Sequence, residues 1–256
     1  MSEIEKLKGI CTEIADEIEA KVKEERKKNF ACFGKEIRMG ADGTHTQYID
    51  KIAEDIALNV VDKKMNILSE EAGFIDYGME YTIVIDPIDG TRNAVHDIPF
   101  YCTSMAIGKS NLRSIEYALV RNIPAGDTYV AEKGKGAFLN GKKIKVDTAL
   151  TDPIFSLVLG KSGDEKTWKA VNIYSIRSLG AAALEMCLVA SGSINAYFEG
   201  KEHLRVTDFA ASTLIVREAG GKVFDAKGNI LDAGFDLEKR SSVLAVSCEK
   251  ILEELI

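Results

Sequence analysis

The sequence predicts a protein of mixed α+β and α/β class, antiparallel-rich over about residues 1–150 and α/β over about residues 151–256. Three observations support this prediction. Apolar residues first recur at helical spacing, short apolar runs separated by turn residues follow, and strands alternate with helices after residue 153. The chain of 256 residues has no internal repeat and no long linker, so we expect a single domain over 1–256.

Two amphipathic helices are expected near the N-terminus. Apolar residues recur every three or four positions from Ile4 to Val22, and the charge run at 23–28 is typical of a solvated helix end. Residues 29–46 contain three glycines and predict a loop or a loosely ordered hairpin. The second helix is expected at 49–60.

Strands dominate the following segment. We expect them at 82–85, 103–107, 115–120, 128–132 and 137–139. Asn140-Gly141 predicts a tight hairpin, because both central positions of such a turn need positive φ. The glycines at 134 and 136 lack the strand–loop–helix context of a phosphate loop, so they are assigned to the same hairpin.

The second half predicts alternating elements. The expected strands are 154–159, 173–176, 194–198, 223–224 and 243–246. The expected helices are one near Trp168, then 181–190 and 208–219, and a short one at the end.

The segment Asp86-Pro87-Ile88-Asp89-Gly90-Thr91 carries the strongest chemical signal. It follows an apolar run and places two carboxylates at the mouth of a buried strand, where Gly90 permits a turn and Thr91 can cap the next helix. Burial of so much negative charge requires a cation. Glu70 and Asp208 follow the same pattern, although Asp208 is equally typical of a helix cap. The motif therefore predicts metal-dependent phosphate chemistry.

Oxygen ligands of this kind suit Mg²⁺ or Mn²⁺. The four carboxylates and the Ile88 carbonyl could hold two ions, which would activate a water and stabilise the leaving oxygen. Thr91 could accept or relay a proton, and the N–H groups of Gly90 and Thr91 would face the phosphate.

Composition narrows the choice of partners. The net charge of −7 argues against nucleic acid and against an anionic membrane surface. No run approaches the roughly 20 apolar residues of a membrane span, and the N-terminus lacks a signal-peptide pattern. The five cysteines form no CxxC, so we expect neither zinc nor disulfides but a cytoplasmic protein of mostly buried thiols, with Cys32 exposed.

Three motifs together resemble the inositol monophosphatase family of magnesium-dependent, lithium-sensitive phosphatases: Glu70-Glu71, Asp86–Thr91 and Asp208-Phe209-Ala210-Ala211. Ser175–Gly180 with Ala182–Cys187, and Glu218-Ala219-Gly220-Gly221, are also similar. Gly40–Thr44 and Phe198–Asp208 resemble the archaeal branch that hydrolyses both fructose 1,6-bisphosphate and inositol phosphates.

The resemblance implies a layered α-β-α-β-α sandwich, commonly a homodimer, that uses two or three Mg²⁺ ions for which Mn²⁺ may substitute. It implies that a metal-activated water attacks the phosphorus directly. The implied metal ligands are Glu70, Asp86, Asp89, Asp208 and the Ile88 carbonyl. Asp42 and Thr91 would orient and deprotonate the water, and the loop around 35–42 would help a third metal to bind. The implied contacts to substrate hydroxyls are Asp89, the Gly180–Ala181 helix start and Glu199.

The sugar pocket is less well defined by the resemblance, because Thr207 stands where the family commonly has Trp and Glu199 is displaced from its usual spacing. A bisphosphate also needs a second anion site, for which Arg177, Lys201 and Arg205 are candidates. Arg177 is favoured by its place at a strand end. Lys201 is equally typical of a solvated loop, and Arg205 of a partner for a nearby carboxylate.

Three other functions are weighed. The first is a nucleotidase acting on adenosine 3′,5′-bisphosphate, for which no aromatic cluster near Gly180 offers an adenine pocket. The second is a non-catalytic interaction protein, disfavoured by the complete ligand set. The third is a structural Ca²⁺ site, disfavoured by the presence of Thr91 and Asp42.

Overall fold

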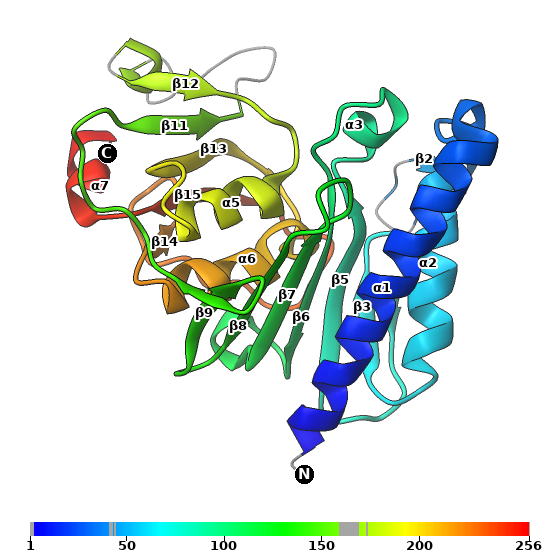
Figure 1. Cartoon of the computed structure of the whole chain (residues 1–256). Coiled ribbons are helices and arrows are strands. Elements are labelled where there is room, and N and C mark those ends of the chain that lie inside the picture. Colours follow the sequence, from blue (N-terminus) through cyan, green and yellow to red (C-terminus); the bar gives the residue numbers. More distant parts are fainter. Residues whose placement is uncertain (1–2, 41–42, 44, 159–168, 173, 256) are drawn as a thin grey trace.

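The computed structural model describes residues 3–40, 43, 45–158, 169–172 and 174–255. Its elements form five layers, in the order helices, large sheet, helices, small sheet, helices (Figure 1). Three hydrophobic clusters fill the spaces between successive layers. The predicted mixed class and the α-β-α-β-α sandwich are confirmed.

The large sheet contains eight strands and is mostly antiparallel. In spatial order they are β10 (Lys142–Ile144), β9 (Gly136–Leu139), β8 (Thr128–Glu132), β7 (Tyr117–Asn122), β6 (Cys102–Gly108), β5 (Thr82–Asp89), β3 (Asn66–Ser69) and β4 (Gly73–Ile75). Only the pairing of β3 with β5 is parallel among these strands. The β9–β10 turn has φ of 50° at Asn140 and 76° at Gly141, which confirms the predicted hairpin.

The outer face of this sheet is covered by α1 (Glu3–Asn29) and α2 (Tyr48–Val61), which lie side by side in Figure 1. Alternate residues of the central strand explain how both faces are covered. Ile83 and Ile85 of β5 pack toward α1 and α2, whereas Val84 packs toward the middle helices. Residues 29–46 do contain a hairpin, formed by β1 (Glu36–Met39) and β2 (His45–Gln47).

The middle layer consists of α5 (Ala182–Ala190) and α6 (Val206–Glu218), which separate the two sheets. Both helices are buried nearly all round, because each has a sheet on either side. The small sheet has the order β12 (Ser175–Arg177), β11 (Ile154–Leu157), β13 (Ala196–Leu204), β15 (Ser241–Val246) and β14 (Lys222–Phe224). The last helix, α7 (Glu249–Leu255), covers its outer face together with the helical residues 169–172.

Some elements differ from the prediction. The strands β3 and β4 were missed, because the four residues of β3 are all buried and show no alternation, and β4 has only three residues. Helix α1 continues through the charge run to Asn29, with Lys–Glu ion pairs at four-residue spacing over residues 19–28. Short elements complete the chain: α3 (Thr91–Val95) and the 3₁₀ turns Phe30–Cys32 and Leu112–Ser114. Trp168 lies outside the described residues.

None of the described helices combines the length and the apolar composition that crossing a bilayer requires. Among the described cysteines Cys32 is exposed, as predicted, and none forms a disulfide.

Candidate active site

A bulge in β5 brings the two aspartates of the motif into one pocket. Residues three apart on a regular strand point to opposite faces of the sheet. Here Asp86 pairs with Ser104 and Asp89 with Cys102, so β5 carries one extra residue between these pairs. Pro87 lies within the bulge, where the N–H that proline lacks is not needed for the ladder. Both aspartates consequently line the same pocket.

Glu70 is placed beside Asp86 by the parallel pairing of β3 with β5. Ser69, the last residue of β3, pairs with Ile85, so the residues that follow them along the chain, Glu70 and Asp86, lie next to each other. Glu70 is half-buried, with 17% of its side chain exposed, whereas Asp86 is buried.

Asp208 comes from the first turn of α6, on the opposite wall. Its Oδ2 accepts a hydrogen bond of 2.8 Å from the backbone N–H of Arg205, the residue that caps the helix. The sequence was compatible with two roles for Asp208, a helix-capping residue and a metal ligand. The structure shows the capping hydrogen bond. Its other oxygen, Oδ1, faces the side chains of Thr207 and Arg205.

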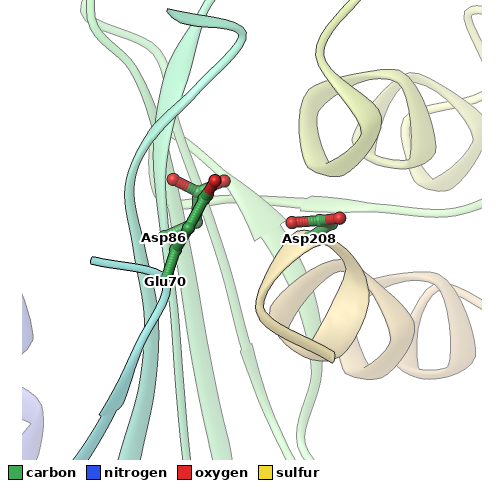
Figure 2. Close-up of side chains that lie close together, drawn as sticks. All are labelled: Glu70, Asp86 and Asp208. Carbon is green, nitrogen blue, oxygen red and sulfur yellow. The ribbon is translucent and has the colours of Figure 1, made fainter. Parts of the chain in front are cut away.

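Oxygens of Glu70, Asp86 and Asp208 all lie within 4.8 Å of one another, although they come from three separate elements (Figure 2). An arrangement of three carboxylate oxygens around one point matches the hard oxygen ligands that Mg²⁺ and Mn²⁺ prefer. Asp89 and the Ile88 backbone line the same pocket, so the five predicted ligands are gathered at one place. The residues present therefore fit a divalent metal.

The pocket has a volume of about 340 Å³ and opens between the large sheet and the middle helices. Besides the acidic residues, its walls contain Thr91 and Arg92 of α3, Arg205, and the apolar side chains of Val158 and Leu204. Gly180 and Ala181, which were predicted to contact the substrate, also line the pocket, together with Ala182, and their contacts to a substrate stay a prediction.

Burial makes the acidic cluster electrostatically costly. It raises the pKa of Asp86 well above its usual range, and the neighbouring charges of Glu70, Asp89 and Asp208 raise it further. Burial, then the Asp208 charge, raises the pKa of Asp89 to about 7. Burial raises the pKa of Asp208, although the positive charge of Arg205 lowers it in part. A bound cation would relieve this repulsion.

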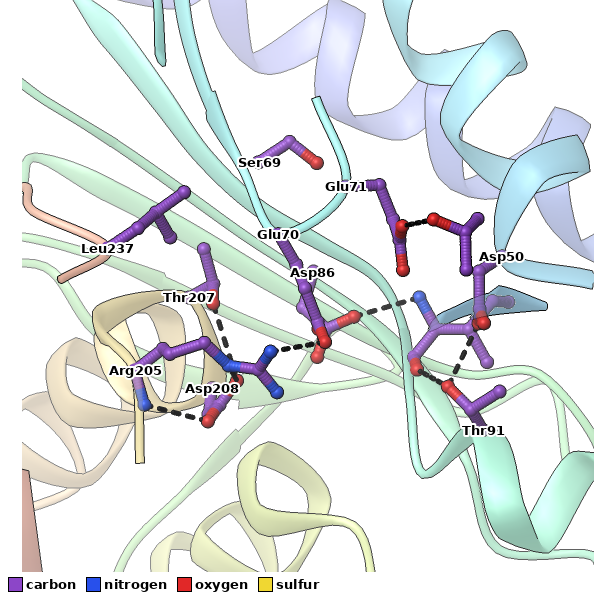
Figure 3. Close-up of polar contacts among 12 residues, drawn as sticks. Asp50, Ser69, Glu70, Glu71, Asp86, Thr91, Arg205, Thr207, Asp208 and Leu237 are labelled. Carbon is purple, nitrogen blue, oxygen red and sulfur yellow. Dashed lines mark hydrogen bonds and ion pairs between the residues drawn. The ribbon is translucent and has the colours of Figure 1, made fainter. Parts of the chain in front are cut away.

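Arg205 supplies positive charge to the cluster in the structure as it stands. Its Nη1 lies 2.5 Å from Glu70 Oε1, and its Nε lies 3.4 Å from Asp208 Oδ1 (Figure 3). From the sequence, Arg205 could contact a phosphate or pair with a nearby carboxylate. The structure shows it paired with carboxylates.

Thr91 is held by a buried aspartate from α2. Its hydroxyl lies 2.9 Å from Asp50 Oδ1 and 2.9 Å from the Ile88 carbonyl oxygen (Figure 3). Burial raises the pKa of Asp50 to about 7. Asp42, the predicted partner of Thr91, lies outside the described residues, so that pairing stays a prediction.

The N-terminus of α5 is occupied by two carboxylates of the protein. Asp89 accepts hydrogen bonds from the N–H groups of Ala182 and Ala183, at 3.2 and 2.7 Å. Glu185 accepts from those of Gly180 and Ala181, at 2.7 and 3.2 Å. Any contact of Gly180 or Ala181 with a substrate hydroxyl therefore has to use other atoms than these N–H groups.

Three predicted substrate residues are not among the described residues that line the pocket. Arg177 is exposed at the edge strand β12, where its guanidinium donates to the neighbouring Ile176 carbonyl. Glu199 is buried and accepts from the backbone N–H groups of Lys201 and His203 within the same strand. Lys201 is half-buried beside it. Their roles at a substrate stay predictions.

Sequence reasoning missed Asp50, Arg92 and Glu185. Asp50 had a local signal, because it stands three residues after the residue that caps α2 and accepts its N–H. Arg92 directly follows the motif, so its adjacency to Thr91 was visible. Glu185 had no such signal in the sequence. Its hydrogen-bond partners include Ser156, which lies in another segment and comes close only in the folded structure.

Comparison with known proteins agrees with this geometry. The model of the inositol monophosphatase family matches residues 3–256. The fructose-1,6-bisphosphatase/inositol-1-monophosphatase of Methanothermobacter thermautotrophicus is 35% identical, covering 100% of this chain and 97% of that protein. A solved structure from Pyrococcus horikoshii, described as having similarities for inositol-1 monophosphatase, has a TM-score of 0.88 and 31% identity, covering 98% of this chain and 97% of that one.

A further relative is longer than this chain. The bifunctional NADP phosphatase/NAD kinase of Methanococcus maripaludis is 37% identical over 86% of this chain, but the match spans only 44% of that protein.

The family model matches nearly the whole chain, and the carboxylate cluster lies in its pocket. The chain therefore belongs to the inositol monophosphatase family of metal-dependent phosphatases and is a phosphoric monoester hydrolase.

Proposed function

We propose that this chain is a Mg²⁺-dependent hydrolase that removes phosphate from fructose 1,6-bisphosphate and from inositol 1-phosphate. The observation that carries the proposal is the convergence of Glu70, Asp86 and Asp208 within 4.8 Å, in a pocket that also contains Thr91. The archaeal relative named for both activities covers the whole chain and supports both substrates.

Glu70, Asp86, Asp89, Asp208 and the Ile88 carbonyl would hold two or three Mg²⁺ ions, for which Mn²⁺ can substitute. Bound divalent ions would polarise the phosphate and lower the pKa of a water molecule. The carboxylates would hold those ions from two facing sides of the pocket, Glu70 and Asp86 on the side of the large sheet and Asp208 on the side of α6.

Thr91 and Asp50 would orient and deprotonate the attacking water. A hydroxyl has one proton, and if Thr91 donates it to Asp50 Oδ1, its lone pairs are directed at an incoming water. Asp50, with a pKa raised to about 7 by burial, can take up the proton that Thr91 passes on near neutral pH. Asp42 stays a proposed contributor to the same step.

The rest of the substrate would occupy the side of the pocket formed by Val158, Leu204 and the segment 180–182. Apolar walls of this kind suit the C–H faces of a sugar or inositol ring. For a second phosphate, Arg92 joins the earlier candidates Arg177, Lys201 and Arg205, because it lines the pocket and is exposed. An exposed arginine can reach a distal phosphate without losing a buried partner.

A second candidate substrate is NADP, whose 2′-phosphate is also a monoester. It is favoured by the sequence similarity to a bifunctional NADP phosphatase/NAD kinase, which is as high as the similarity to the sugar phosphatase. The support for this candidate comes from matches of this chain to part of such longer bifunctional proteins.

Phosphate release from a panel of substrates, with and without Mg²⁺, tests these proposals. The panel contains fructose 1,6-bisphosphate, inositol 1-phosphate, NADP and adenosine 3′,5′-bisphosphate. We expect the first two to give the highest kcat/KM, and only with Mg²⁺. Preference for NADP or for the nucleotide would reassign the substrate. No release with any of them would favour a non-catalytic role or a structural Ca²⁺ site.

We also propose that the whole chain works as one domain, as a homodimer and in the cytoplasm. The proposal follows the family resemblance, and light scattering of the purified protein tests the oligomeric state.

A further inference from the structure

We propose that Arg205 is a built-in counter-cation, which neutralises part of the carboxylate cluster in the metal-free protein and releases Glu70 when divalent ions bind. Metal binding would then be an exchange of one cation for another. This inference rests on the proposed metal dependence and specifies how the site controls it.

The contacts of Arg205 place its charge inside the cluster. Its Nη1 lies 2.5 Å from Glu70 Oε1, a close ion pair, and its Nε lies 3.4 Å from Asp208 Oδ1. Both carboxylates belong to the group whose oxygens lie within 4.8 Å of one another. The guanidinium thus contacts two of the three carboxylates that form the candidate metal centre (Figure 3).

The charge balance explains why a cation is needed there before metal arrives. Asp86 and Asp208 are buried, with 4% and 6% exposure, and Glu70 is half-buried. Buried like charges at such distances repel strongly, because little solvent screens them. With Glu70, Asp86 and Asp208 ionised, one guanidinium leaves two of their three negative charges unbalanced, and Asp89 in the same pocket adds to this excess.

The same contacts make Arg205 a competitor for the metal. The Glu70 oxygen that accepts the guanidinium at 2.5 Å cannot offer the same lone pair to a metal ion. A positive charge this close also repels an incoming divalent ion. Metal therefore binds best after the guanidinium has moved away from Glu70.

The backbone geometry allows this movement. Arg205 precedes the first residue of α6, and its own N–H is held by Asp208 Oδ2 at 2.8 Å. The backbone is anchored, while 19% of the side chain is exposed at the pocket. Rotation of the Arg205 side chain alone can therefore break its contact with Glu70 without changing the helix.

The exchange would lower the affinity for metal and so tie activity to the free metal concentration. It makes opposite predictions for the two forms of the protein: removal of the Arg205 charge should destabilise the metal-free form and strengthen metal binding. A residue that only positions Glu70 and Asp208 would weaken metal binding when removed.

The test compares the wild type with Arg205→Gln and Arg205→Lys. Mn²⁺ is titrated into each metal-free protein by calorimetry, and each melting temperature is measured in EDTA. We expect Arg205→Gln to bind Mn²⁺ about tenfold more tightly and to melt several degrees lower in EDTA. Arg205→Lys keeps the charge but loses the planar fork, so its values should lie between the two.

The matched control is Arg113→Gln. Arg113 is exposed and forms an ion pair of 2.9 Å with Asp232, outside the pocket, so its loss should leave Mn²⁺ affinity unchanged. A folded Arg205→Gln protein that binds Mn²⁺ as weakly as the wild type, or more weakly, would overturn the inference. If Arg205→Gln does not fold, the lysine variant and a wild-type crystal structure with Mn²⁺ decide, since the Arg205–Glu70 contact must open in that structure. Failure of the wild type to bind Mn²⁺ would overturn the proposed function instead.

Discussion

Thr91 and Asp50 are separated by 41 residues, and the hydroxyl of the first lies 2.9 Å from Oδ1 of the second. The contact joins the short helix after β5 to the first turn of α2. Because α2 packs against the large sheet and the bulge in β5 fixes the motif, both partners are held by the core. The geometry of this proposed water-activating pair therefore depends on the packing of α2, which is remote in sequence from Thr91.

Loss of either partner should slow catalysis without removing metal. We expect Asp50→Asn and Thr91→Ala each to lower kcat about 10²-fold or more, the usual size of a lost acid–base contribution. Mn²⁺ affinity should change little, because neither side chain is in the carboxylate cluster. Asp55→Asn, on the exposed side of the same helix, is the matched control. A large loss of Mn²⁺ affinity in Asp50→Asn would contradict the assigned role.

Asp42 and Asp50 can be ranked by the same assay. Since the Thr91 hydroxyl is already held by Asp50, Asp42→Asn should lower kcat less than Asp50→Asn does. Steady-state rates of the two variants at saturating Mg²⁺ measure the difference. A greater loss in Asp42→Asn would make Asp42 the main base, as the family resemblance implies.

Replacement of Asp86 should separate metal binding from folding. We expect Asp86→Asn to abolish Mg²⁺-dependent turnover and to raise the melting temperature in EDTA, because it removes one of the repelling buried charges. For a chain of this size each 1 kcal/mol corresponds to roughly 2–4 °C. Phosphate release and thermal melts in EDTA measure the two effects. Normal activity in this variant would refute the metal assignment.

The metal-free protein should become more stable as the pH falls. Burial raises the pKa values of Asp50, Glu54 and Asp89 to about 7 in the folded state, whereas the unfolded carboxyls keep their usual values. The folded state therefore binds more protons between roughly pH 4 and 7, and a falling pH in this window favours it. Urea unfolding in EDTA at pH 8, 7, 6 and 5 measures the change.

Glu54→Gln should reduce this pH dependence, because Glu54 is fully buried and contributes one of the shifted carboxyls. A stability that falls steadily from pH 8 to pH 5 in the wild type would contradict the expected sign.

Gly90 should tolerate no side chain. Its φ is 89°, and an added Cβ would lie 3.0 Å from the Ala181 Cβ and 3.2 Å from the Phe100 carbonyl oxygen. Gly134 is the control, since its φ is 77° but its surroundings are open. We expect Gly90→Ala to cost about 1–3 kcal/mol more than Gly134→Ala, the usual cost of overpacking. Urea unfolding measures it, and equal losses would show that only backbone strain matters.

Arg92 should matter for the bisphosphate and not for the monophosphate. We expect Arg92→Gln to raise KM for fructose 1,6-bisphosphate about tenfold or more, with KM for inositol 1-phosphate nearly unchanged, because the latter has no second phosphate. Arg177→Gln gives the comparison with an arginine outside the described pocket lining. A selective rise in Arg177→Gln alone would restore the prediction from the sequence.

The periodicity of the chain predicted most elements because each has its own local pattern. The hairpin at Asn140-Gly141 and the amphipathic α1 are examples. The sequence could not predict β3, whose four residues are buried on all sides and have no alternation. It is the parallel pairing of β3 with β5 that places Glu70 at the site.

The site was predicted to the extent that its residues stand in motifs. The predicted metal ligands stand in contiguous or characteristic segments, and the structure gathers these residues in one pocket. Asp50 and Glu185 were missed because their roles come from contacts with residues of other segments. Arg177 was favoured for its strand end, but that strand lies at the edge of the small sheet.

The four N–H groups at the start of α5 are each taken by Asp89 or Glu185. Free N–H groups at the start of a helix attract phosphate. At the start of α5 these groups already donate hydrogen bonds to carboxylates of the protein. Without divalent ions the pocket should thus repel oxyanions, so chelated enzyme would neither retain inorganic phosphate nor be blocked by sulfate. We therefore expect the product phosphate and the metal ions to leave the pocket together.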